Sequence, residues 1–141
     1  MEQHRPHAIL VGASSPQALP LADDVRAVLA AILDENPRCF IETGTGEPLV
    51  LFADETVPAA WASSPAAAEE LPAAPRAVRR AVGLARAALD PLAVLCALCQ
   101  PGRNDLCTAL PLHALQSAVP RDELWAALEP VLVAAAAHNL R

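Results

Sequence analysis

The stretch Arg38–Asp54, RCFIETGTGEPLVLFAD, carries the clearest strand signal in the sequence. Two apolar, β-favouring runs, Cys39–Ile41 and Leu49–Phe52, flank a short turn that contains two glycines. Glycine supplies the positive φ angle that a tight reversal needs, so the pattern is typical of a β-hairpin. Leu49–Phe52 is apolar at every position, which predicts a central strand covered on both faces. The charged arm Arg38–Thr43 suits the edge of a sheet.

A strand and a helix are expected before this hairpin. His7–Val11, HAILV, is short, apolar on both faces and followed by Gly12, which predicts a buried strand. Leu21–Glu35 is the clearest helix, and Asn36-Pro37 is expected to end it. Its apolar residues at helical spacing predict one buried face: Leu21, Val25, Val28, Leu29, Ile32 and Leu33. The order β-α-β-β follows, with the three strands arranged 2-3-1 in the sheet.

The rest of the chain is predicted to be linker and helix. Residues 56–75 are rich in Ala, Pro and Ser and lack an apolar period, which indicates a mobile linker. The expected helices are Arg76–Leu89, Pro91–Gln100, one near Leu112–Val119, and Arg121–Leu140 with a kink at Pro130. The sequence therefore predicts a single α/β (α+β) domain over residues 1–141. It has a β-α-β-β half (1–55), the linker (56–75) and a helical half (76–141), with about five helices packed on the three-stranded sheet.

The composition limits the compartment and the partners. The 141 residues carry a net charge of −6 and include 14 prolines and no lysine. Phosphate recognition depends on a basic field, so this charge argues against direct nucleic-acid binding. The longest apolar run, Pro91–Cys99, is far shorter than the roughly 20 residues that span a bilayer, and the N-terminus lacks the pattern of a signal peptide. We therefore expect a soluble intracellular protein of the cytoplasm and/or nucleus.

Three cysteines and a histidine form a candidate metal site. Cys96, Cys99, Cys107 and His113 are spaced C-x2-C-x7-C-x5-H, and tetrahedral zinc takes such sulfur and nitrogen ligands. The first pair, however, lies in an apolar run, whereas zinc-binding pairs usually sit among glycine or polar neighbours. Free cysteine is among the most buried residue types. We predict thiols without a metal or cofactor, and keep a zinc-binding module as an alternative.

The same region carries a resemblance to a known family. Pro91–Cys96, PLAVLC, followed by Leu110-Pro111-Leu112, resembles the elongin-binding box and the downstream cullin-selecting motif of SOCS-box proteins. The sequence departs from that pattern at Gln100, where an apolar residue is expected, and at His113, where a second proline is expected. The resemblance implies an adaptor of a ubiquitin ligase. The alternative, which we favour, is a buried helix, because short matches arise freely in chains rich in Leu and Ala.

Four arginines lie on roughly one face of the helix predicted at Arg76–Leu89: Arg76, Arg79, Arg80 and Arg86. One interpretation is a patch that binds phosphate or an acidic partner. The other is a solvated helix face that pairs with Glu69, Glu70 or other carboxylates, and the acidic chain favours it.

No catalytic constellation is apparent in the sequence. Gly12–Ser15 follows a strand, but a single glycine is too little for a nucleotide-binding turn. None of the four histidines lies beside a credible nucleophile, so we predict no catalytic residues. A small α/β enzyme or ligand binder with a site near Gly12–Ser15 remains an alternative.

The apolar strand at the sheet edge is the strongest indication of function. An edge with no charge between His7 and Gly12 must be covered by the chain's own helices or by another chain. We expect a non-enzymatic protein–protein interaction module, an adaptor or structural subunit of a larger complex. The partner is another protein chain, in a hetero- or homo-oligomer. The predicted partner-binding residues are Ile9, Leu10 and Val11, with Trp61 as an aromatic anchor.

Overall fold

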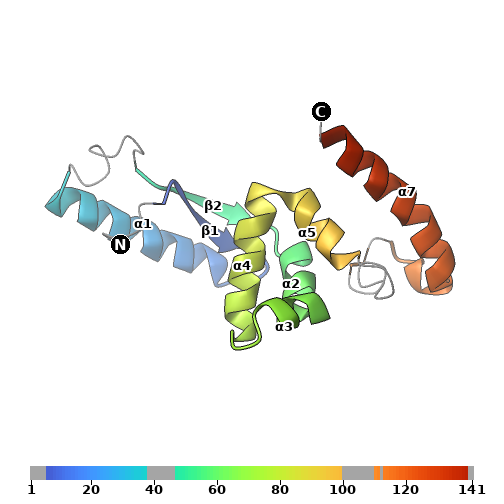
Figure 1. The fold of residues 1–141 in the computed structure, drawn as a ribbon. Helices are drawn as coiled ribbons and strands as arrows, with labels where there is room; N and C mark the ends of the chain where they lie inside the picture. Colours follow the sequence, from blue (N-terminus) through green and yellow to red (C-terminus); the bar gives the residue numbers. More distant parts are fainter. Residues whose placement is uncertain (1–5, 38–46, 100–109, 112, 140–141) are drawn as a thin grey trace. The chain divides into compact units, whose positions relative to one another are not determined.

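The computed structural model describes residues 6–37, 47–99, 110–111 and 113–139. The chain forms two compact units, Met1–Asp54 and Glu55–Arg141. Over the described residues the fold is α+β, with one two-stranded parallel sheet and six α-helices (Figure 1). The predicted strand Arg38–Thr43 lies outside the described residues, so a three-stranded sheet is not confirmed. The single domain stays a prediction.

The first unit is a β-α-β arrangement. Strands β1 (Ala8–Gly12) and β2 (Leu49–Ala53) pair in parallel, in a register that sets Ala8 opposite Leu49 and Gly12 opposite Ala53. Helix α1 (Ala18–Glu35) connects them and lies along one face of the sheet (Figure 1). The first and third predicted strands are therefore neighbours, as the order 2-3-1 requires.

Helix α1 begins three residues before its predicted start and ends where predicted. The backbone N–H of Asn36 donates to the Ile32 carbonyl at 2.9 Å, and Pro37 follows. Small side chains of α1 form the core with the sheet: Ala18 and Ala22 pack with Val11 and Val50. The predicted apolar face is only partly buried. Leu29 is 1% exposed, whereas Leu21 and Val28 are each 54% exposed.

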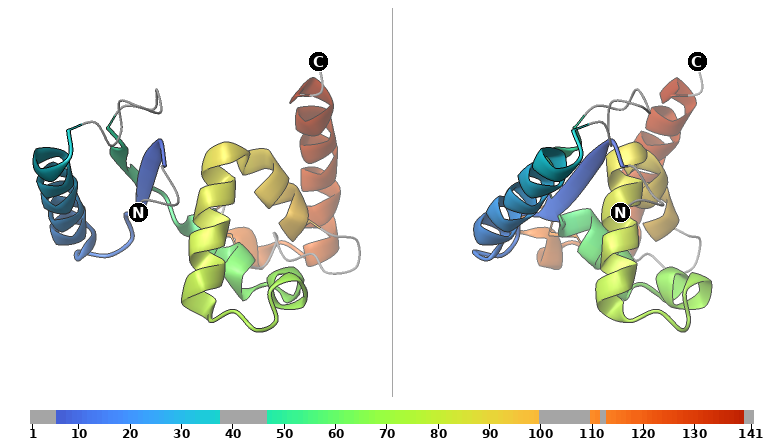
Figure 2. Two further views of the ribbon diagram at one scale, coloured as in Figure 1. Left: turned by 60° about the vertical axis from the view of Figure 1, so that its left-hand side comes forward. Right: turned by 90° about the vertical axis from the view of Figure 1, so that its left-hand side faces the viewer.

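The second unit is helical within the described residues. Its elements are α2 (Thr56–Ser63), α3 (Pro65–Glu70), α4 (Arg76–Leu89), α5 (Pro91–Leu98), a short 3-10 helix (Gln116–Ala118) and α7 (Arg121–Asn139). Helix α4 has its predicted bounds, and Pro130 lies inside α7 as predicted. Figure 2 shows α2 lying alongside α4 in both views.

The prediction that residues 56–75 lack regular structure is wrong. Ser64 separates α2 from α3, and its buried Oγ accepts a hydrogen bond from the Ala67 N–H at 3.2 Å and donates one to the Trp61 carbonyl at 2.8 Å. Pro65 occupies the first turn of α3, where a missing N–H costs nothing. The two helices are too short and too rich in Ala to show an apolar period, so only the Ser-Pro cap marks them in the sequence.

Trp61 is the centre of the second core. It is 2% exposed and packs in one cluster with Ala67 of α3 and Val94 and Leu98 of α5. Gly83 of α4 gives it room, because a Cβ atom there would lie 3.0 Å from Trp61 Cε3. Burial of Trp61 therefore depends on a close approach between α2 and α4.

Candidate functional site

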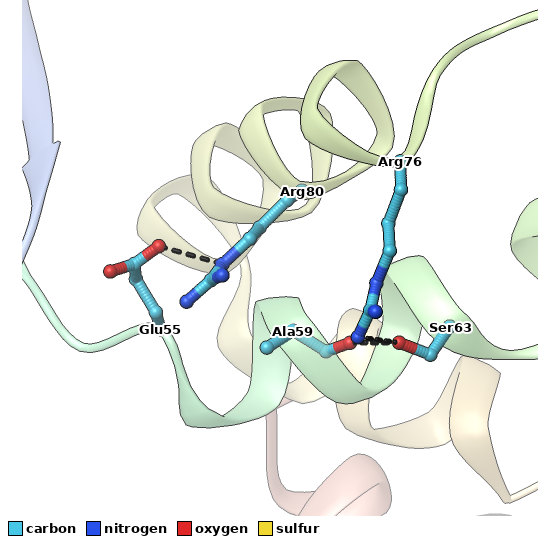
Figure 3. Close-up of polar contacts among 5 residues, drawn as sticks. All are labelled: Glu55, Ala59, Ser63, Arg76 and Arg80. Atoms are coloured by element: carbon cyan, nitrogen blue, oxygen red, sulfur yellow. Dashed lines mark hydrogen bonds and ion pairs between the residues drawn. The ribbon is translucent and has the colours of Figure 1, made fainter. Parts of the chain in front are cut away.

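The arginines of α4 are engaged within the second unit. Arg80 Nε lies 2.7 Å from Oε1 of Glu55, the residue before α2, and Arg76 donates to Oγ of Ser63, the last residue of α2, at 2.9 Å (Figure 3). Arg79 Nε donates to the Leu71 carbonyl at 3.0 Å. These groups hold neighbouring segments together, which favours the structural interpretation of the arginine-rich face over an anion-binding patch.

Arg86 also contacts a neighbouring segment, and it pairs with Glu70, one of the carboxylates predicted from the sequence. Both of its terminal nitrogens donate to the Glu70 carboxylate, and its guanidinium lies 5.0 Å from the centre of the Trp61 ring. The hydrogen bonds from Arg86, reinforced by its charge, lower the pKa of Glu70 despite some desolvation. The pair links α3 to α4 over the buried tryptophan.

Replacing Glu70 with glutamine is expected to lower the melting temperature at neutral pH and to have little effect in acid. Because the folded-state pKa of Glu70 is depressed, its contribution is present above the ordinary value of 4.5 and is lost as the pH falls through the lower folded-state pKa. Thermal unfolding by circular dichroism along a falling pH series measures this. Glu129→Gln on exposed α7 is the matched control, and an equal pH dependence for both variants would contradict the assignment.

The described cysteines and His113 do not form a metal site. Cys96 is exposed, and the half-buried Cys99 thiol donates to the Leu95 carbonyl at 3.1 Å. His113 is exposed and its Nδ1 accepts from the Leu115 N–H at 3.1 Å. Cys107 lies outside the described residues, so the absence of a bound metal stays a prediction.

The segment Gly12–Ser15 begins at the last residue of β1, ends before α1, and is tied into local structure. The Ala13 N–H donates to the Ala53 carbonyl at 3.0 Å, and Ser15 Oγ accepts from the Gln17 N–H at 3.2 Å. A pocket of about 320 Å³ lies near the other end of β2, lined by Arg26, Leu29 and residues 47–50. Parallel sheets bind ligands at the carboxyl ends of their strands, and this pocket is at the amino end of β2. The pocket therefore does not coincide with the loop singled out as an enzyme or ligand site.

The face of the sheet away from α1 is apolar and open to solvent. Side chains alternate along a strand, and Val11 and Val50 point to the α1 side because they pack there. Leu10, Leu49 and Leu51 therefore belong to the opposite face. Leu49 is 62% and Leu51 45% exposed. The prediction that Leu49–Phe52 is covered on both faces is wrong for the described structure, because α1 supplies only one layer.

The predicted partner-binding residues do not share one surface in the structure. Leu10 lies on the open face, beside its register partner Leu51. Val11 is buried against α1, and Ile9, two positions away, shares that side. The prediction of Trp61 as an aromatic anchor for the partner is wrong, because the side chain is 2% exposed and lies in the core. Leu49 and Leu51 were not predicted from the sequence as partner-binding residues. In a strand that is covered on one face only, the alternation of side chains would place both on the exposed face.

No helix among the described residues has the length and apolar character needed to cross a membrane.

Comparisons with known proteins give two relatives. The chain is 34% identical over 133 residues to a transcription elongation factor SPT6 homolog of Arabidopsis thaliana, covering 94% of this chain and 8% of the relative. It is 29% identical over 133 residues to a transcription elongation factor SPT6-like protein of the same plant, covering 94% of this chain and 10% of the relative. The chain thus spans a tenth or less of the length of these curated relatives. No family model matches the chain, so the SOCS-box resemblance gains no support, and no solved structure matches it.

Proposed function

We propose that the chain is a non-enzymatic protein-interaction module of a nuclear transcription elongation assembly. Its binding surface is the open sheet face, defined as Leu10, Leu49 and Leu51. A protein partner packs on this face as the second layer of the sheet.

The open sheet face is the observation that carries this proposal. Parallel strands occur almost entirely in sheets covered on both faces, because their crossover connections and neighbours supply a layer on each side. Here α1 supplies one layer, and leucines occupy the other side at 62% and 45% exposure. Contiguous exposed apolar surface of this kind marks interaction sites in soluble proteins.

The two relatives support the part of the proposal that places the chain in a transcription elongation assembly. Both are named for transcription elongation, and similarity runs over 94% of this chain. Both are also about ten or more times longer than the matched segment. In proteins of that length, a segment of this size has other protein surface available to pack against. A net charge of −6 favours protein over nucleic acid as the direct contact.

Leu51→Asp is expected to remove the protein from transcribed chromatin in the cells that express it. An aspartate in the centre of the open sheet face would have to be desolvated when the partner binds. Chromatin immunoprecipitation of the tagged full protein along active genes measures the loss, and circular dichroism verifies the fold. Leu49→Ser serves as the gentler variant if Leu51→Asp does not fold.

Val78→Asp is the matched control, because Val78 is 49% exposed on α4, close to the 45% of Leu51. It should leave chromatin association unchanged. Equal association of wild type and a folded Leu51→Asp protein would reject the open sheet face as the binding surface. Absence of the wild-type protein from the nucleus would reject the proposed role in a transcription elongation assembly.

A further inference from the structure

Helix α1 carries more apolar surface than the sheet covers. Its buried residues, Ala18, Ala22 and Leu29, follow one line along the helix. Leu21 and Val28 are exposed by 54% each and are seven residues apart. This surface is separate from the open sheet face, because it lies on the helix that covers the other side.

These two residues form a ridge along the helix. At about 100° per residue, Leu21 and Val28 lie within about 20° of each other and roughly 90° from the buried line. Val25 and Ile32, both half-buried, occupy the angle between the ridge and the core. The seven-residue repeat is the spacing at which one helix meets another.

Two carboxylates border the ridge on its solvent side. Asp24 and Glu35 project about 20–60° beyond Leu21 and Val28, and both are exposed. Within the described residues neither makes an ion pair, whereas Asp23, on the other side of the helix, pairs with Arg26 at 2.8 Å. Residues 1–54 as a whole contain eight carboxylates and three arginines. An apolar ridge with an acidic border therefore lies in an acidic field.

We infer that the α1 ridge, defined as Leu21, Asp24, Val28 and Glu35, binds a basic amphipathic helix of a partner protein. The apolar stripe of that helix packs on Leu21 and Val28, and arginine or lysine beside the stripe pairs with Asp24 and Glu35. A second copy of the chain is a poor occupant, because it would bring like carboxylates together. The inference rests on the proposed function, and names a second surface and its partner chemistry.

Two synthetic three-heptad peptides test the inference with the full chain. Both carry the same leucine seam; one has arginine and the other glutamate beside it. Fluorescence anisotropy at low salt should show about tenfold tighter binding of the arginine peptide, weakening as salt is added. Val28→Ser should reduce that affinity about tenfold, while Val78→Ser, the same change at a similarly exposed helical position, should not. Asp24→Arg with Glu35→Arg should transfer the preference to the glutamate peptide.

Several results would overturn the inference. These are equal affinity for the two peptides, no binding of either, or equal losses from Val28→Ser and Val78→Ser. Self-association of the wild-type chain that Val28→Ser abolishes would make a second copy the occupant and overturn the choice of partner. Loss of peptide binding in Leu49→Ser alone would reject the α1 ridge and leave the open sheet face standing, so the two proposals fail separately.

Discussion

Trp61→Ala is expected to lower the free energy of unfolding of the second unit by about 3–5 kcal/mol, the usual cost of truncating a buried aromatic side chain. The indole is 2% exposed and fills the space between α2, α3 and α5. Alanine would leave a cavity, and it would also remove the ring that lies 5.0 Å from the Arg86 guanidinium. The short helices α2 and α3 cannot close that space by themselves, because most of their other side chains are small.

Denaturant unfolding followed by far-UV circular dichroism measures this effect, since fluorescence would change with the loss of Trp61 itself. Hydrogen exchange in α2, α4 and α5 assigns the change to the second unit. Trp125→Ala in α7 is the matched control, because Trp125 is only half-buried and should cost clearly less. Equal costs for the two tryptophans would show that Trp61 is not the centre of the core.

The elements that the sequence predicted best are those with a strong local signal. Helix α4 was predicted with its bounds, and α1 was predicted to end at Asn36 because proline follows. Strands β1 and β2 were recognised as short apolar runs, and their adjacency was predicted from the apolar character of β2. The ion pair between Arg86 and Glu70 was among the predicted pairings of the arginine-rich helix.

The features that were missed depend on what lies opposite each element in space. Leu89 at the end of α4 is apolar but 88% exposed, whereas the buried residues of α4 are Gly83 and Leu84. Trp61 was predicted as a partner-binding residue, and no hydrophobic period in the surrounding sequence indicates its burial. A hydrophobic period marks a helix but does not say which of its apolar residues face the core, and the same limit applies to Leu21 and Val28 of α1.

The burial of β2 also differs between the sequence-based prediction and the structure, and the difference points to a candidate surface. An apolar run such as Leu49–Phe52 predicts burial on both faces, and the described structure supplies only one layer. The difference between predicted and observed burial therefore identifies the open sheet face. The apolar sequence of β2 predicts a packing layer on each face of the sheet, and the described structure shows that the face carrying Leu49 and Leu51 has none.

Gly83→Ala is expected to destabilise the second unit by about 1–3 kcal/mol, the usual cost of overpacking a core. Glycine to alanine within a helix ordinarily stabilises by up to about 1 kcal/mol, so even the sign of the effect is informative. A Cβ atom at Gly83 would lie 3.0 Å from Trp61 Cε3 and 3.2 Å from the Pro58 carbonyl oxygen. The second of these is backbone of α2 and cannot be relieved by a side-chain rotation, so the two helices must separate. Separation would in turn loosen the packing of Trp61.

Ala85→Gly on the exposed side of α4 provides the control for helix propensity, and should cost about 1 kcal/mol through propensity alone. Chemical denaturation of the two variants, followed by circular dichroism, separates the contributions. If Gly83→Ala stabilised the protein by as much as Ala85→Gly destabilised it, propensity alone would govern position 83 and the close approach of α2 and α4 would be wrong. A loss in both variants means that the missing side chain at position 83 is what allows α4 to approach α2 closely enough to bury Trp61.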